Sequence, residues 1–377
     1  MTAHPVYLDH NATSPLRPAA TAAMRAALDD VGNPSSVHDF GQRARRLVDG
    51  VRQQIADALA SAPLDVVFTS GGTEANNLVL FGAQAKRLIV SVVEHDSVLG
   101  AARASGRPFD LVPVDREGRI DLDELERTLA AGPERALVSI MFANNETGVV
   151  QPVAEIARRV RTAGALFHCD AVQAFGRLPL MPALFDADFV TLSAHKIGGP
   201  PGVGALVVRG DHALAPQLHG GGQERFRRAG TQNVPGIAGF GAALQDALIS
   251  DDERERIAAL RYQFEAGLSV AGGVVIGAGA ERLPNTSAVA MPGVKSETQI
   301  IALDIDGIAV SAGAACSSGK VTRSHVLEAM KVPDALAEST IRISLGWSTQ
   351  QDDVSRAIAA WTALRERTLS NRGRDAA

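Results

Sequence analysis

A lysine at the end of an expected strand is the first residue of this chain that could do chemistry. Lys196 belongs to the segment SAHKIGGPPGVGALVV, in which a loop rich in glycine and proline follows the strand. Ligands of open α/β sheets bind at the carboxyl ends of the strands. A lysine there can form a Schiff base, whose carbon is an electrophile. A loop lysine is otherwise a solvated side chain, so neighbouring segments have to decide between the two interpretations.

An aspartate and a glutamine follow another apolar strand earlier in the chain. The segment FHCDAVQAFG contains Asp170 and Gln173. Pyridoxal phosphate withdraws electrons only while its ring nitrogen is protonated, and a carboxylate beside that nitrogen keeps the proton in place. Asp170 suits this role. The alternative is an aspartate that only caps a helix.

A phosphate site is indicated further upstream, in the segment DVVFTSGGTEANNLVL. Its pattern is a strand, two glycines, a threonine and a helix. The free N–H groups of a first helical turn and the helix dipole attract an anion, and the Thr73 hydroxyl adds a donor beside Gly72. A plain tight turn is the alternative for the two glycines.

These segments need a fold that brings several strand ends together. Short runs rich in valine and isoleucine recur at 66–69, 88–93, 136–142, 165–169, 189–192 and 204–208. Amphipathic stretches such as 18–28 and 152–163 separate several of them, which predicts an α/β domain with a largely parallel, helix-covered sheet. After about residue 255, a charged helix and the shorter strand-like pieces 287–291 and 308–311 predict a smaller α+β domain. We expect a large domain at 15–255 and a small one made of 1–14 and 256–377.

Composition excludes several classes of protein. The 377 residues include 37 Lys+Arg and 42 Asp+Glu, a net charge of -5, so no basic field exists to hold nucleic acid or an anionic membrane. The start of the chain lacks a signal-peptide pattern, and no run approaches the roughly 18 apolar residues of a membrane span. Two cysteines are too few for a disulfide framework or a zinc-type cluster. We expect a cytoplasmic protein that binds neither nucleic acid nor membrane.

A phosphate cup, a strand-end aspartate and a lysine in this order look like the fold-type I pyridoxal-phosphate enzymes. More closely, the chain resembles the cysteine desulfurases (NifS/IscS-like), the sulfur-mobilising branch of the class V aminotransferase family. The likeness covers nearly the whole chain, through the motifs YLDHNATSP, GNPSSVHDFGQRAR, TSGGTEANN, EHDSV, NNETGVVQP, HCDAVQAFG, SAHKIGGPPGVGAL, GGGQERFRRAGTQNV, SAGAACSSG and IRISLG. It implies a seven-stranded, mostly parallel sheet, pyridoxal 5'-phosphate as the cofactor, and a homodimer.

The resemblance assigns cofactor-binding roles to residues of the matching motifs. It implies that Lys196 forms the Schiff base, that Asp170 keeps the ring nitrogen protonated, and that Gln173 bonds the phenolate oxygen. The phosphate site that it implies consists of Gly72, Thr73, Ser193 and His195, with Thr231 reaching it from the partner subunit.

The resemblance also implies how the substrate is held. His95 would stack on the ring face and can shuttle protons, although a lone histidine after a strand is otherwise structural. Asn145 would lie near the ring and the substrate carboxylate. Arg342 would take that carboxylate with its planar fork, joined by Asn11 or Asn33.

Two cysteines receive different interpretations. Cys316 lies among small residues in SAGAACSSG, and the resemblance makes it the nucleophile that takes sulfur from L-cysteine as a persulfide, leaving L-alanine. His95 is the candidate base for its thiol. Cys316 could also act as a transient iron-sulfur ligand shared with a scaffold. Cys169 lies within an apolar strand, and we expect it to be structural.

The sulfur acceptor stays open from the sequence: an iron-sulfur scaffold, a route to thiolated tRNA, or another protein. The alternatives to a desulfurase are a selenocysteine lyase, a transaminase of the same class, and a catalytically idle interaction protein. The sequence departs from the family pattern in three places: His10, Phe226 and the short tail after Arg342. These departures put partner docking in doubt.

Overall fold

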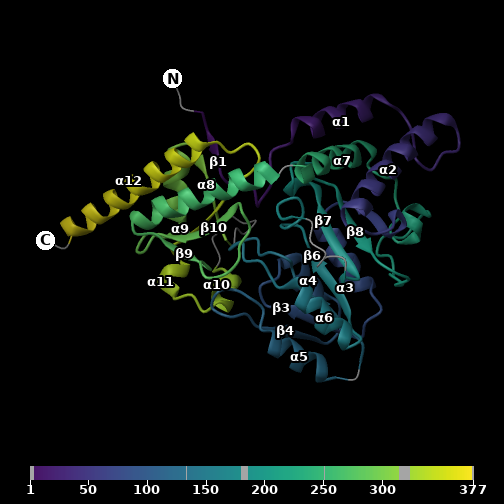
Figure 1. Cartoon of the computed structure of the whole chain (residues 1–377), viewed down its shortest axis with the longest axis horizontal. Coiled ribbons are helices and arrows are strands. Elements are labelled where there is room, and N and C mark those ends of the chain that lie inside the picture. The colour runs from purple at the N-terminus through teal and green to yellow at the C-terminus, as the bar shows by residue number, and fades with distance from the viewer. Residues whose placement is uncertain (1–3, 133, 180–185, 250, 314–322, 376–377) are drawn as a thin grey trace.

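The computed structural model of the chain describes residues 4–132, 134–179, 186–249, 251–313 and 323–375. The larger part of the molecule contains a seven-stranded sheet in the order β2-β8-β7-β6-β5-β3-β4, of which β3, β4, β6, β7 and β8 are labelled in Figure 1. Its strands are β2 (Val66–Thr69), β3 (Arg87–Ser91), β4 (Phe109–Val112), β5 (Ala136–Ser139), β6 (Leu166–Asp170), β7 (Phe189–Ser193) and β8 (Gly204–Val208). Strands β4, β3, β5, β6 and β7 are parallel, whereas β8 is antiparallel to both of its neighbours. The predicted mostly parallel, seven-stranded sheet is confirmed.

Helices cover both faces of this sheet. They are α1 (Pro18–Asp29), α2 (Asp39–Ala58), α3 (Gly72–Gly82), α4 (Asp96–Ala104), α5 (Leu122–Ala130), α6 (Val153–Thr162) and α7 (Val234–Ile249). Alternate strand residues point into two separate cores: Leu88 and Val90 pack with α3 and α4, and Ile89 packs on the face of α2, α6 and α7. Strands buried on both faces are apolar throughout, which is why these runs are visible in the sequence.

A smaller α+β part stands beside the large sheet (Figure 1). Its antiparallel sheet has the order β12-β13-β10-β9, with β9 (Val274–Ile276), β10 (Thr286–Ala290), β12 (Ser311–Ala312) and β13 (Thr340–Ser344). Its helices are α8 (Asp251–Val270), α9 (Ser296–Ile305), α10 (His325–Ala329), α11 (Asp334–Ala337) and α12 (Gln351–Asp375). The expected strand at 308–311 is two strands, because β11 (Ile308–Ala309) pairs with β1 (Val6–Tyr7) and β12 pairs with β13.

The beginning of the chain packs with its end. One hydrophobic core consists of Val6 and Leu8 together with residues between Ile257 and Leu364. The expected boundary at 255/256 falls inside α8. The division into 15–255 and 1–14 with 256–377 stays a prediction.

Sheet register brings the three sequence motifs to one edge. Gly204 of β8 pairs with both Thr69 at the end of β2 and Ser193 at the end of β7. A Cβ on Gly204 would lie 2.7 Å from the Cα of Gly71, so only glycine lets the loop before α3 approach this closely. Asp170 pairs with Thr191, one strand further along the sheet.

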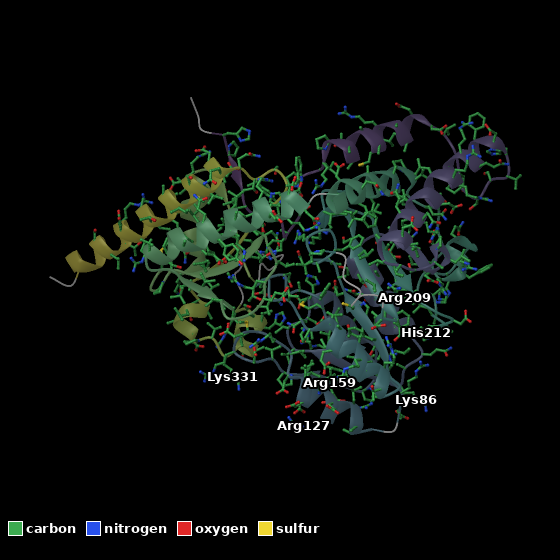
Figure 2. The ribbon with its side chains drawn as sticks, in the orientation of Figure 1. Lys86, Arg127, Arg159, Arg209, His212 and Lys331 are labelled. Atoms are coloured by element: carbon green, nitrogen blue, oxygen red, sulfur yellow. The ribbon has the colours of Figure 1, made fainter. Side chains whose placement is uncertain are left out.

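Figure 2 labels Arg127 and Arg159 in the part of the molecule that contains the large sheet, and both side chains form ion pairs with acids. Arg127 bonds to Glu124 at 2.7 Å, and Arg159 bonds to Glu126 at 2.6 Å. Ion pairs at the surface such as these contribute little to stability. In the part of the chain that the structure describes, no helix combines the length and apolar character needed to cross a membrane.

Candidate active site

A cavity of about 380 Å³ lies at the carboxyl edge of the large sheet, which is within the usual range for ligand sites. The large sheet contributes Asp170 and Ser193 to it, and the small sheet contributes Arg342. It is lined by eleven residues that the sequence predicted for the site: Asn11, Gly72, Thr73, His95, Asn145, Asp170, Gln173, Ser193, His195, Lys196 and Arg342. The fold therefore brings together side chains that are widely separated in the sequence.

Lys196 ends a short 3₁₀ helix, η3 (Ala194–Lys196), that directly follows β7. Its Nζ donates to the backbone oxygens of Asn11 at 2.6 Å and Ala12 at 2.7 Å. Burial, then the cations of Arg177 and Arg342, lower the pKa of Lys196 to about 7. Much of this lysine is therefore neutral near pH 7, with a lone pair available for a carbonyl group. It is not the free, solvated lysine of the alternative interpretation.

The first turn of α3 forms one wall of the cavity. A Cβ on Gly72 would lie 2.9 Å from the Cγ2 of Val172, so the glycine lets this turn pack closely against Val172. The N–H groups of the turn and the hydroxyls of Thr73 and Ser193 suit a phosphate. His195 completes the group, and burial, followed by Lys196 and Arg177, lowers its pKa to about 4. His195 is thus neutral near pH 7.

Asp170 receives two hydrogen bonds at the floor of the cavity. Its Oδ1 accepts from the backbone N–H of Val172 at 3.0 Å, and its Oδ2 accepts from Nδ2 of Asn76 at 2.7 Å. The two donors fix the orientation of the carboxyl group in the cavity that it lines. Asn76 lies on α3 and was not singled out in the sequence, although it belongs to the TSGGTEANN motif.

Asn76 also connects Asp170 with His95. Its Nδ2 lies 2.8 Å from the Oγ of Ser97, and that oxygen lies 2.8 Å from Nδ1 of His95. The same Nδ1 accepts the backbone N–H of Ser97 at 3.1 Å, which caps α4. Because Nδ1 is an acceptor here, the proton of a neutral His95 lies on Nε2. His95 is therefore arranged as a donor through Nε2, and the expected base role at the Cys316 thiol stays a prediction.

Arg342 projects from β13 into the cavity. Its Nη2 donates to Asp9 at 2.8 Å and its Nη1 donates to the Asn145 carbonyl at 3.2 Å. Its Nε is buried and has no hydrogen-bond partner among the described residues. Arg342 therefore presents a cation to the cavity that it lines, and its predicted contact with the substrate carboxylate stays a prediction. Asp9 was not predicted as part of the site.

The Asn11 side chain bonds to four residues from separate parts of the chain. Its side-chain Nδ2 donates to Thr286 at 2.9 Å and to the Asn145 carbonyl at 3.1 Å, while its Oδ1 accepts from Arg177 at 2.7 Å and Asn285 at 3.1 Å. All of its amide capacity is used. The structure makes Asn11 a support of the cavity wall, and its predicted contact with substrate is not tested.

Two predicted residues do not line this cavity. Asn33 and Thr231 are both exposed and lie outside this cavity. The predicted contribution of Thr231 to a partner subunit stays a prediction, and so does the role of Asn33.

Cys316 lies outside the described residues, although Gly313 lines the cavity. No group of three His, Cys, Asp or Glu side chains that could hold a metal occurs among the described residues.

His10 and Phe226, two of the departures from the family pattern, have opposite surroundings. His10 is buried, stacks edge-on against Tyr7 at 5.3 Å, and bonds to Ser14 at 2.9 Å. Burial first, then two arginines, lower its pKa to about 3, so it is neutral. Phe226 is 75% exposed and follows two other residues with positive φ. The buried Glu224, paired with Arg52 at 2.9 Å, anchors that strained turn.

Comparison with known proteins gives one consistent family. The family described as Aminotransferase class-V matches residues 6–357. The chain is 39% identical to the "Cysteine desulfurase IscS" of Dictyoglomus turgidum, over 97% of this chain and 96% of that one. It is 42% identical to a "Cysteine desulfurase" of Cereibacter sphaeroides, over 94% of each chain.

Solved structures agree with these relatives. A NifS-like protein from Rickettsia africae superposes with a TM-score of 0.89 at 35% identity, over 96% of this chain and 100% of that one. The structure described as "SspA in complex with cysteine" superposes with a TM-score of 0.80 at 31% identity, over 90% of this chain and 98% of that one.

Proposed function

The chain belongs to the aminotransferase class-V family, in its cysteine desulfurase branch, and we propose that it uses pyridoxal 5'-phosphate to convert L-cysteine to L-alanine. The sulfur atom passes to Cys316, which becomes a persulfide. The carbon–sulfur bond of the substrate breaks, a sulfur–sulfur bond forms at Cys316, and a proton replaces sulfur on the β-carbon. Further transfer goes to an iron-sulfur scaffold or another acceptor protein.

One observation carries this proposal: a half-buried lysine, a phosphate cradle and a hydrogen-bonded aspartate line a single cavity. Gly72, Thr73, Ser193 and His195 would hold the phosphate. Asp170 would face the ring nitrogen and Gln173 the ring oxygen, with His95 against the ring. These residues fit the cofactor, because the phosphate, the ring nitrogen and the ring oxygen of pyridoxal phosphate would each have a polar partner in this cavity.

When bound, pyridoxal phosphate withdraws electrons from the carbon atoms of an attached amino acid. The residues of the chain supply the rest. Lys196, with its lowered pKa, is a neutral amine that can take the proton of the α-carbon. Arg342 orients the substrate carboxylate, and His95 donates through Nε2.

The structure describes the environment of one of the two cysteines, Cys169. Cys169 is fully buried in β6, and burial, then the charges of Asp170 and Glu94, raise its thiol pKa well above the usual value. It stays protonated at neutral pH and is a poor nucleophile. This favours Cys316, in the motif SAGAACSSG, as the sulfur acceptor.

The proposal is tested by incubating the cofactor-loaded protein with L-cysteine and a thiol reductant. We expect alanine and sulfide in equal amounts from the wild type and neither from Lys196→Ala. Transfer of the amino group to a 2-oxo acid, without release of sulfide, would identify a transaminase instead. Turnover of selenocysteine alone would identify a selenocysteine lyase.

We further propose that the active protein is a homodimer in which Thr231 of each subunit serves the partner's phosphate site. The exposure of Thr231 away from its own cavity is compatible with this arrangement. Size-exclusion chromatography with light scattering tests it, and a monomer with full activity would contradict it.

A further inference from the structure

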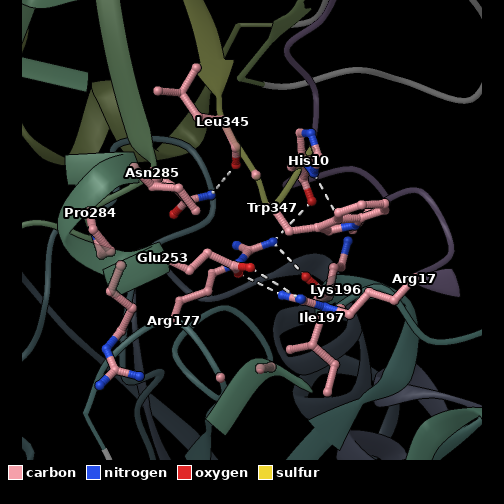
Figure 3. Close-up of a pocket in the computed structure, with 16 residues that line it drawn as sticks. His10, Arg17, Arg177, Lys196, Ile197, Glu253, Pro284, Asn285, Leu345 and Trp347 are labelled. Atoms are coloured by element: carbon pink, nitrogen blue, oxygen red, sulfur yellow. Dashed lines mark hydrogen bonds and ion pairs between the residues drawn. The ribbon is translucent and has the colours of Figure 1, made fainter. Parts of the chain in front are cut away.

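Arg177 is a largely buried cation whose hydrogen-bond partners are all neutral. Its guanidinium donates to the backbone oxygens of His10 and Lys196, both at 2.9 Å (Figure 3), to Oδ1 of Asn11 at 2.7 Å, and to Oε1 of Gln173. Burial and the Arg342 cation lower its pKa to about 9, and no carboxylate of the described residues forms an ion pair with it. Burying a cation without a carboxylate partner costs free energy. The presence of Arg177 at this position therefore points to a functional role.

The contact with Gln173 has a directional consequence. A carboxamide has an oxygen that only accepts and an NH₂ group that only donates. Arg177 occupies the oxygen, and Nε2 donates one N–H to the Asn11 carbonyl at 3.1 Å. Exchanging the two ends of the amide would set NH₂ against the guanidinium and lose both bonds. The second N–H of Nε2 is therefore the part of Gln173 available to the cavity that it lines.

The same arginine fixes the surroundings of Lys196. It holds the carbonyl of Lys196 and the side chain of Asn11, and the Asn11 carbonyl accepts from both Lys196 and Gln173. The amine and the amide donor are thus oriented toward the same region by one side chain.

We propose that Arg177 is a positioning residue that locks the amide of Gln173 with its N–H toward the cavity, so that the site selects a ligand with an anionic ring oxygen at that place. This inference rests on the proposed function, because the ring oxygen of pyridoxal phosphate is the atom that Gln173 would meet. Arg177 itself does not line the cavity. It acts through Gln173.

The test measures binding without turnover, in a Lys196→Ala background that cannot capture the cofactor covalently. Fluorescence titration gives the Kd of pyridoxal phosphate and that of the analogue lacking the ring oxygen. A hydrogen bond to a charged group predicts a preference for pyridoxal phosphate of about tenfold or more. Arg177→Met and Gln173→Ala should each bring this ratio close to one, and the double variant should lower it no further.

Arg17→Met is the matched control. Arg17 lines the same small pocket as Arg177 and bonds to the Ile197 carbonyl at 3.0 Å, but its carboxylate partner is Glu253 and no bond joins it to Gln173 (Figure 3). Its removal should leave the ratio unchanged. An unchanged ratio in Arg177→Met, or a double variant that falls below both single ones, would overturn the inference.

Arg177→Lys covers the case in which the methionine variant does not fold. A lysine ammonium keeps the charge and can still donate to Oε1 of Gln173, so the preference should survive; its loss in folded protein contradicts the inference. Failure of the parent to bind either compound would count against the proposed function. Equal binding of both compounds to the Lys196→Ala parent would contradict this inference and leave the proposed function standing.

Discussion

Arg342 of β13 donates from Nη2 to the Oδ1 of Asp9 at 2.8 Å, so an ion pair joins the two ends of the chain at the cavity wall. Asp9 follows directly after the core residue Leu8, and Arg342 lies in the central strand pair of the small sheet. The pair balances one charge of the cavity and holds the guanidinium in place. The same guanidinium lines the cavity, where a substrate carboxylate would meet it.

The first prediction concerns this arginine. Arg342→Ala should weaken the binding of L-cysteine by about 2 to 5 kcal/mol, because one partner of a desolvated charge pair is removed. The apparent affinity can be measured from the concentration dependence of sulfide release. Arg356→Ala is the control, since Arg356 of α12 bonds to the exposed His4 carbonyl and should not affect affinity. Unchanged affinity in folded Arg342→Ala would show that this arginine serves structure only.

The second prediction follows from the lowered pKa of Lys196. The neutral amine is the reactive form, so the rate at which the apoprotein captures pyridoxal phosphate should rise with pH through about 7 and then level off. A lysine with an ordinary pKa near 10.4 would instead give a rate that still rises about tenfold per unit at pH 9. Stopped-flow absorbance over this range distinguishes the two. A continued rise above pH 9 contradicts the geometry that we describe.

The third prediction concerns Asn76. Asn76→Ala removes a donor from Asp170 and breaks the connection to Ser97 and His95, so kcat should fall by about tenfold or more, as for a lost bond to a charged group. Asn77→Ala is the matched control, because this neighbouring amide bonds only to backbone oxygens. Equal kcat values for Asn76→Ala and Asn77→Ala would show that Asn76 does not contribute to turnover.

Much of the site could be predicted because its residues lie in motifs at strand ends. Lys196, Asp170 and Gly72 each follow an apolar run, and parallel strands bring such ends to one edge. The apolar runs themselves were recognisable because both faces of the sheet are buried. The mostly parallel order of the sheet follows from the same pattern.

The supporting residues could not be predicted in this way. Asn76 lies inside a helix and Arg177 lies in a loop, and neither position has a local pattern that distinguishes a buried polar side chain from a solvated one. Their roles depend on contacts with Asp170 and Gln173, which only the fold creates. The strained turn at Phe226 also depends on a distant contact, the pair of Glu224 with Arg52.

The fourth prediction separates stability from turnover at the cysteines. Cys169→Ser places a hydroxyl in the apolar core of the large domain, so it should lower the free energy of unfolding by about 1 to 3 kcal/mol and leave kcat close to wild type. Cys316→Ser should unfold like wild type, bind cofactor and L-cysteine, and release neither alanine nor sulfide. Thermal denaturation and the sulfide assay measure the two effects. Full turnover by Cys316→Ser would contradict the desulfurase mechanism and favour a selenocysteine lyase or a transaminase.

The most direct measurement is mass spectrometry of the wild-type protein after brief exposure to L-cysteine without reductant. Transfer of sulfur to an enzyme thiol predicts an added mass of about 32 Da on the peptide that contains Cys316, and none on the peptide that contains Cys169. Lys196→Ala, treated in the same way, should show no added sulfur. Sulfur on Cys169, or alanine formed with no sulfur on Cys316, would contradict the account.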